Sequence, residues 1–111
     1  MLDLGQVRSF IMVASELNFS RAARRLNITQ PPLSRQIKLL EQTLDVTLFE
    51  RNSRRVVLTP AGLTFLVEAQ KLLEIGNAAV TVTRRAARGS AGAVKVAFVG
   101  AATYSFLPGF I

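Results

Sequence analysis

Residues 29–38 read TQPPLSRQIK and place two adjacent prolines directly before a segment that otherwise looks helical. Proline is costly inside a helix, because it lacks an N–H group and clashes with the preceding turn. In the first turn this cost disappears, because the N–H groups there have no intrahelical partner. With Thr29 or Gln30 as the cap, both prolines fall in the first turn of a helix that we predict to run to about Thr43.

The predicted helix has one apolar face and one polar face. Apolar side chains recur at the spacing of a single helix face, at Leu33, Ile37, Leu40 and Leu44. The opposite face carries Pro31, Ser34, Arg35, Lys38 and Gln42. Arg can bind guanine through two hydrogen bonds, Gln suits adenine, and Ser suits a phosphate or a base edge. We therefore predict a helix that reads the DNA major groove, and the alternative is a charged stripe that is simply solvated.

Two shorter helices are predicted before this reader helix. The first is indicated by an apolar repeat at intervals of three and four, formed by Leu4, Val7, Ile11, Ala14 and Leu17. Residues 18–20 break the pattern, and Ser20 is a natural N-cap for a short helix over residues 21–26. The inner face of that short helix would be Ala22, Ala23 and Leu26. Two short helices followed by a reader helix form a helix-turn-helix.

A basic hairpin is predicted after the reader helix. Two short extended segments, residues 48–51 and 56–58, flank a polar turn. The turn holds Arg54 and Arg55, which suits a wing that reaches phosphates or the minor groove. The alternative is an ordinary surface turn that resists aggregation.

A long helix is predicted from Thr59-Pro60, which repeats the cap-then-proline start, to about Arg88. It is longer than a small domain needs for its own core, and apolar or small residues repeat along it at a spacing near 3.5. The expected dimerisation stripe consists of Phe65, Ala69, Leu72, Gly76, Ala79 and Thr83. A neighbouring apolar stripe is formed by Leu63, Leu66, Leu73 and Val80.

The expected organisation has four parts. Residues 1–59 form a winged helix-turn-helix domain, and residues 60–88 form the linker and dimerisation helix. Residues 89–93 are small and form a hinge. Residues 94–111 begin with a β-branched strand, which cannot bury itself alone, so we expect the incomplete start of an α/β domain in a longer protein.

Composition narrows the function classes. The 111 residues carry a formal charge of +7, with a pI near 11.4, which favours a polyanionic partner. The sequence contains no Cys and no His, so it cannot form a disulfide, a Cys/His zinc site or a Ser-His-Asp triad. We expect no enzyme activity, no cofactor and no metal. Neither a signal peptide nor a membrane span is expected, so the predicted location is the cytoplasm.

Several motifs resemble the LysR-type transcriptional regulators. They are Ala22-Ala23 with Leu26, the run from Thr29 to Ser34, Leu48-Phe49-Glu50-Arg51, and Leu58-Thr59-Pro60-Ala61-Gly62. The resemblance implies a mainly α protein: a winged helix-turn-helix, a long linker helix and an effector-binding domain of periplasmic-binding-protein type. One departure is Asp45, where the family usually has glycine. Asp tolerates a left-handed backbone better than most residues, so the turn is expected to survive.

The resemblance also implies partners and residue roles. Double-stranded DNA would be bound at an interrupted palindrome by a homodimer, with a tetramer in the full-length protein. Groove-facing residues would be Gln30, Pro31, Ser34 and Arg35, and backbone contacts would come from Ser20, Arg21, Lys38, Arg51 and Arg54. Pro32 and Arg55 are further candidate DNA-binding residues. A small-molecule effector, an organic acid from aromatic catabolism, would require the complete effector domain, where Ala101 and Thr103 are candidate contacts.

Two other classes compete with specific DNA binding. A dimerisation or scaffold module would explain the long helix but not the basic reader face. A basic segment on a membrane surface would carry its cations along one long helix. Here the cations cluster on the short helices and the hairpin, which argues against a membrane partner.

Overall fold

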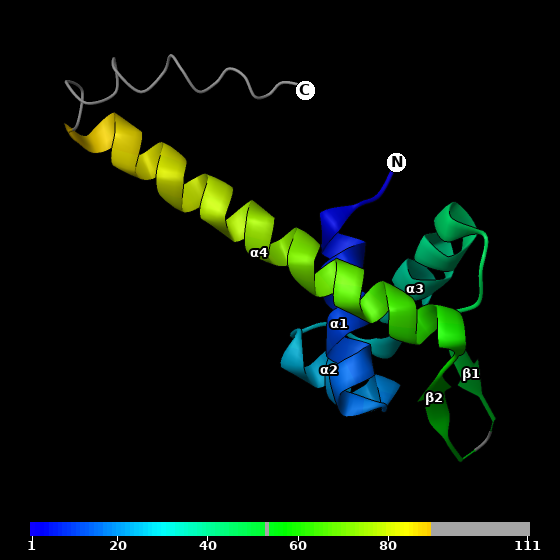
Figure 1. The fold of residues 1–111 in the computed structure, drawn as a ribbon. Helices are drawn as coiled ribbons and strands as arrows, with labels where there is room; N and C mark the ends of the chain where they lie inside the picture. Colours follow the sequence, from blue (N-terminus) through cyan, green and yellow to red (C-terminus); the bar gives the residue numbers. More distant parts are fainter. Residues whose placement is uncertain (53, 90–111) are drawn as a thin grey trace. The chain divides into compact units, whose positions relative to one another are not determined.

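The computed structural model describes residues 1–52 and 54–89. In this part of the chain, four helices and one hairpin follow each other in the order shown in Figure 1. They are α1 (Leu4–Glu16), α2 (Phe19–Arg25), α3 (Gln30–Leu44), β1 (Phe49–Arg51), β2 (Val56–Leu58) and α4 (Pro60–Gly89). The mainly helical winged helix-turn-helix is thus confirmed. The strand expected at residues 94–99, together with Ala101 and Thr103, lies outside the described residues.

The chain divides into two compact units, residues 1–74 and 75–111. The first unit contains α1 to α3, the hairpin and the first half of α4, and it holds the candidate site. The described part of the second unit is the rest of α4.

The reader helix α3 forms as the prolines predict. Thr29 is its N-cap residue, without a side-chain cap hydrogen bond, and both prolines lie in the first turn. Leu33, Ile37 and Leu40 are completely buried, which confirms the apolar face. The helix ends at Asp45, whose φ of 57° and ψ of 41° are left-handed. Asp45 therefore does adopt the conformation for which glycine is better suited.

Both short helices differ in detail from the prediction. The buried face of α1 is Val7, Phe10 and Val13, because α1 turns this side toward the core. Leu4 and Leu17 are 51% and 44% exposed, so their place in the predicted inner face was wrong.

The prediction of Ser20 as N-cap was also wrong. Asn18 caps α2, since its side chain accepts a hydrogen bond from the Arg21 N–H at 2.8 Å. Helix α2 therefore begins at Phe19, and this start turns the Phe19 ring into the core, where it is 6% exposed. Ala22 and Ala23 are buried as predicted.

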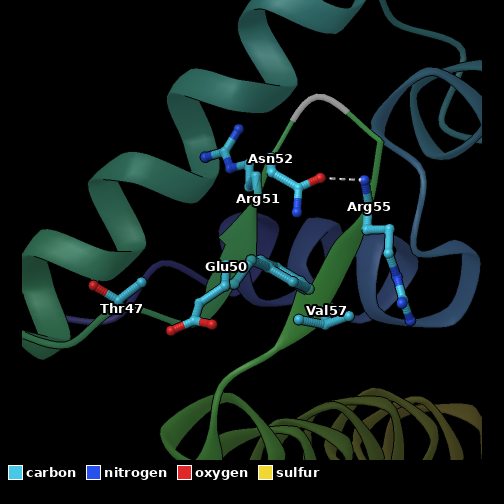
Figure 2. Close-up of a pocket in the computed structure, with 7 residues that line it drawn as sticks. Thr47, Glu50, Arg51, Asn52, Arg55 and Val57 are labelled. Carbon is cyan, nitrogen blue, oxygen red and sulfur yellow. Dashed lines mark hydrogen bonds between the residues drawn. The ribbon is translucent and has the colours of Figure 1, made fainter.

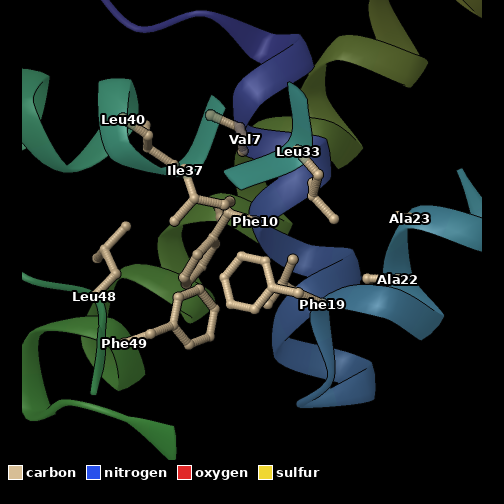
Figure 3. Close-up of a cluster of buried hydrophobic side chains, with 12 residues drawn as sticks. Val7, Phe10, Phe19, Ala22, Ala23, Leu33, Ile37, Leu40, Leu48 and Phe49 are labelled. Carbon is tan, nitrogen blue, oxygen red and sulfur yellow. The ribbon is translucent and has the colours of Figure 1, made fainter. Parts of the chain in front are cut away.

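Four aromatic rings join the elements of the first unit, and Figure 3 labels Phe10, Phe19 and Phe49 among them. Phe10 of α1 lies 5.4 Å from Phe49 of β1 and 5.2 Å from Phe65 of α4, measured between ring centroids. Phe19 of α2 meets Phe49 edge-on at 6.0 Å. Tilted and edge-on arrangements are the favoured geometries of aromatic pairs. The rings therefore fix the hairpin and α4 against the helix-turn-helix.

The hairpin is antiparallel, with Phe49 opposite Leu58 and Arg51 opposite Val56. Its turn is held by Asn52, whose side-chain oxygen accepts hydrogen bonds from the backbone N–H groups of Arg54 and Arg55 at 2.8 and 2.9 Å. This Asx-type arrangement orients the basic turn that the sequence predicted.

The start of α4 is bonded to the start of the hairpin. Thr59 caps α4 by accepting from the Gly62 N–H at 2.9 Å, and its hydroxyl donates to the carbonyl of Thr47 at 2.6 Å. The buried Leu48 N–H donates to the Glu41 carboxylate of α3 at 2.8 Å. One cluster of hydrogen bonds thus connects α3, β1 and α4.

Two residues of the predicted dimerisation stripe belong to the core of their own chain. Ala69 is fully buried, and Phe65 is partly buried against the core with its ring on Phe10. Ala69 therefore offers no free surface to a second chain, and this part of the prediction needs correction. The large apolar side chains that α4 does expose are Leu63, Val67, Ile75, Val80 and Val82.

Candidate nucleic-acid interface

The exposed face of α3 carries free cations. Arg35 and Lys38 are exposed, and neither forms an ion pair with a carboxylate among the described residues. Ser34 is half-buried beside them, and Pro31 is exposed in the first turn. A helix that presents unpaired cations and short polar groups to solvent has the donors that base edges and phosphates accept.

The inner side of α3 is oriented by a polar contact that the sequence analysis missed. The hydroxyl of Ser9, which is 5% exposed, donates to the side-chain oxygen of Gln36. This bond joins α1 to α3 in the buried part of the molecule. Because the partners are 27 residues apart, no local pattern reveals the pair.

A basic recess lies between the start of α3 and the wing. It has a volume of about 290 Å³, and five of the predicted DNA-binding residues line it: Ser20, Gln30, Arg51, Arg54 and Arg55. Ser20 and Gln30 are bonded to each other, with the hydroxyl donating to the amide oxygen at 3.0 Å. The fold thus brings residues of α2, α3 and the hairpin to one place, which their positions in the sequence do not show.

Arg51 is held in this recess by an aromatic ring. Its guanidinium carbon lies 4.4 Å from the centroid of the Phe19 ring, within the range of a cation–π interaction. Because α2 starts one residue before the predicted cap, Phe19 is available for this contact. The stacking restrains an arginine between the wing and the helix-turn-helix.

The other side of the hairpin is a second hollow of about 610 Å³ (Figure 2). Its lining includes Arg51 and Arg55, but also the carboxylate of Glu50 and the apolar Val57. Figure 2 shows the Asn52 side chain bonded to the backbone of Arg55 at the turn. The presence of Glu50 makes this side a poorer anion site than the recess beside α3.

Arg21, another predicted backbone contact, is engaged inside the chain. Its Nε donates to one carboxylate oxygen of Glu16 at 3.2 Å, and Arg25 donates to the other at 2.6 Å. The hydrogen bond from Arg25 is the main reason why the pKa of Glu16 lies below its usual value; desolvation opposes this shift and Arg21 adds to it. No local pattern in the sequence marks Glu16, because its partners are on the next helix.

Membrane insertion and metal binding find no support in the described residues. None of the helices within residues 1–52 and 54–89 is long and apolar enough to cross a bilayer. The same residues contain no group of three or more acidic, His or Cys side chains that could hold a metal ion.

A helix-turn-helix followed by a β-hairpin, with cations on the exposed face of the third helix, defines the winged helix-turn-helix class of DNA-binding domains. Within that class, residues 4–63 match the sequence profile described as "Bacterial regulatory helix-turn-helix protein, lysR family". The chain belongs to this family.

Curated relatives are similar to the whole chain. HTH-type transcriptional regulator TfdS of Cupriavidus pinatubonensis (strain JMP 134 / LMG 1197) is 46% identical over 110 residues, which are 99% of this chain and 37% of the relative. HTH-type transcriptional regulator AlsR of Bacillus subtilis (strain 168) is 50% identical over 108 residues, or 96% of this chain and 35% of the relative. The chain therefore spans little more than a third of the length of these regulators.

Solved structures of DNA-binding domains have the same fold. The crystal structure of the BenM_DBD/catB site 1 DNA complex has a TM-score of 0.76 and 45% identity, and the match covers 79% of this chain and 98% of that one. The CbnR_DBD–DNA complex has a TM-score of 0.76 and 41% identity, covering 78% of this chain and 100% of that one. Both of these structures are complexes with DNA.

Proposed function

We propose that this chain is the DNA-binding part of a LysR-type transcriptional regulator that recognises an interrupted palindrome as a homodimer. The observation that carries the proposal is the exposed face of α3, where Arg35 and Lys38 have no carboxylate partner among residues 1–52 and 54–89, beside the basic recess of about 290 Å³. Support comes from similar domains whose crystal structures are complexes with DNA. The cytoplasm, where bacterial DNA lies, is the proposed location.

The proposed roles follow from chemistry and position. Arg35 reads a base, because a guanidinium group can make two hydrogen bonds to guanine in the major groove. Gln30, Pro31, Pro32 and Ser34 are the other proposed groove-facing residues. Backbone contacts are proposed for Ser20, Arg21, Lys38, Arg51, Arg54 and Arg55, which add affinity that is independent of sequence and sensitive to salt.

The long helix is the proposed dimerisation element, with corrected contact positions. Of the stripe inferred from the sequence, Ala79 and Thr83 are exposed and Leu72 and Gly76 are half-buried, so these remain candidates. We propose in addition that the full-length regulator forms tetramers and responds to an organic acid of aromatic catabolism through the α/β domain that residues 94–111 begin. This part of the proposal depends on family resemblance.

Fluorescence anisotropy across a salt series tests specific readout. One duplex is an interrupted palindrome enriched from a random library by this protein, and the other is the same duplex scrambled. Arg35→Ala should remove the preference for the enriched duplex, at a loss of about 1–3 kcal/mol for the base that it reads. Arg54→Ala should weaken binding to both duplexes and reduce the magnitude of the salt slope by about 1.

Arg8→Ala is the matched control, since Arg8 is an exposed arginine of α1 outside the proposed interface. It should leave the preference between duplexes unchanged. If the wild type binds both duplexes equally at every salt concentration, specific readout is wrong.

A second candidate function, a dimerisation module without specific readout, rests on the exposed apolar side chains of α4, such as Leu63, Val67 and Ile75. Sedimentation analysis with and without DNA distinguishes it. A dimer that forms without DNA and shows no duplex preference would favour this second function.

A further inference from the structure

Two arginines of α2 share one carboxylate at the end of α1. Glu16 receives Arg21 Nε on one oxygen at 3.2 Å and Arg25 Nη1 on the other at 2.6 Å. Arg21 also donates through Nη2 to the backbone carbonyl of Glu16 at 3.3 Å. The Glu16 side chain is only 15% exposed, while those of Arg21 and Arg25 are 54% and 61% exposed. The carboxylate thus lies beneath two guanidinium groups that face solvent.

Other basic side chains of the proposed interface are not paired in this way. Within residues 1–52 and 54–89, Arg35 and Lys38 of α3 have no carboxylate partner, and neither do Arg54 and Arg55 of the hairpin. Pairing thus separates Arg21 and Arg25 from the cations of the reader helix and the wing.

Carboxylate and phosphate are equivalent partners for a guanidinium group, since both accept charge-assisted hydrogen bonds from its fork. Glu16 therefore occupies, in the free protein, donors that a DNA phosphate would otherwise use. It also cancels one of the two positive charges of Arg21 and Arg25. A phosphate near α2 must compete with an anion that is already in place.

We propose that Glu16 acts as a surrogate anion, which restrains Arg21 and Arg25 from phosphate binding and so sets part of the sequence-independent affinity for DNA. The proposal rests on the proposed DNA-binding function. Phosphate contacts supply almost all of the affinity for random DNA, whereas base contacts at α3 add to the affinity for the correct site. A phosphate contact contributes the same factor to random and to specific binding, so Glu16 lowers the affinity for both by weakening the phosphate contacts of Arg21 and Arg25.

The test compares Glu16→Gln, which keeps the shape and removes the charge, with Glu68→Gln. Glu68 pairs with Lys71 on α4 at 3.5 Å, and both side chains are well exposed. The two variants change the net charge equally. Any difference between their DNA binding therefore arises from the position of Glu16 and not from the net charge. Anisotropy is measured on the enriched and scrambled duplexes across the same salt series.

For Glu16→Gln on the scrambled duplex, we expect the salt slope to steepen by about 0.9, the value for one additional phosphate contact. With ~1 M salt as the reference, this change in slope makes binding at ~0.1 M salt roughly eightfold tighter than that of the wild type. The gain on the enriched duplex should be the same factor, so that the preference between the duplexes is unchanged. Glu68→Gln should show neither change.

Two further variants separate this role from a structural one. In an Arg21→Gln/Arg25→Gln background, the effect of Glu16→Gln on the slope should vanish, because the arginines that it releases are absent. Glu16→Asp keeps the charge and should keep the wild-type slope, even if its thermal midpoint is lower.

Three results would overturn the proposal: equal slopes for Glu16→Gln and Glu68→Gln, a preference between the duplexes that changes in Glu16→Gln, or a Glu16→Asp slope that matches Glu16→Gln. Failure of DNA recognition itself is a different result, because the wild type would then show no preference between the duplexes.

Discussion

Gly62→Ala tests the contact between the first turn of α4 and the start of the hairpin. A Cβ atom on Gly62 would lie 2.2 Å from the carbonyl oxygen of Leu48 and 2.9 Å from Cδ2 of Leu58. The Leu58 methyl group can rotate, but the Leu48 carbonyl is part of the backbone. That carbonyl also accepts a hydrogen bond from the Thr59 N–H at 3.0 Å, so moving it breaks the connection between β1 and α4.

Two opposing effects determine how much Gly62→Ala changes the free energy of unfolding. Replacing glycine with alanine in a helix is favourable by about 1 kcal/mol. Overpacking typically costs about 1–3 kcal/mol, and a clash with backbone belongs at the upper end of that range. We therefore expect Gly62→Ala to lower the free energy of unfolding by about 2 kcal/mol. For a domain of this size, that corresponds to a fall in Tm of roughly 8–16 °C.

Urea and thermal unfolding followed by circular dichroism measure this change. Gly76→Ala is the matched control on the same helix, because a Cβ there would meet no atom within 4 Å. It should stabilise α4 by about 1 kcal/mol, and sedimentation at the same concentration shows whether the assembly state has changed. If Gly62→Ala raises the urea midpoint as Gly76→Ala does, the reasoning from the Leu48 contact is refuted.

Three other substitutions address single features of the fold. Asp45→Gly should stabilise the protein by about 1 kcal/mol in urea unfolding, because it relieves the left-handed backbone at φ 57°, whereas Asp45→Ala should not. Glu41→Ala should destabilise it by about 1–3 kcal/mol, because the buried Leu48 N–H loses its acceptor, and Glu41→Gln should cost less. The lowered pKa of Glu16 predicts a contribution to stability that is present at neutral pH and lost as pH falls through the acidic range. Glu16→Gln should therefore flatten the acid limb of a Tm-against-pH curve, and an unchanged acid limb would contradict the ion pairs.

The local signals that were correct share a property: each acts within a few residues. The prolines of α3 and Thr59-Pro60 of α4 mark helix starts, because the N–H groups of a first turn need no intrahelical partner. The apolar face of α3 follows from its spacing alone. The error at the start of α2, Ser20 instead of Asn18, arose because both residues are good caps. Burial of the Phe19 ring decided between them, and burial depends on the rest of the fold.

By itself, the sequence determined the order of the elements, the proline-led reader helix, the basic turn and the family motifs, because periodicity, caps and charge are read along the chain. Tertiary structure alone decided which polar groups are free. It buried Ala69 in its own chain, placed Arg51 over Phe19, and tied two arginines of α2 to Glu16, while Arg35 has no carboxylate partner in the described part of the chain. Those pairings depend on distances between separate helices and strands, which no spacing in the sequence encodes.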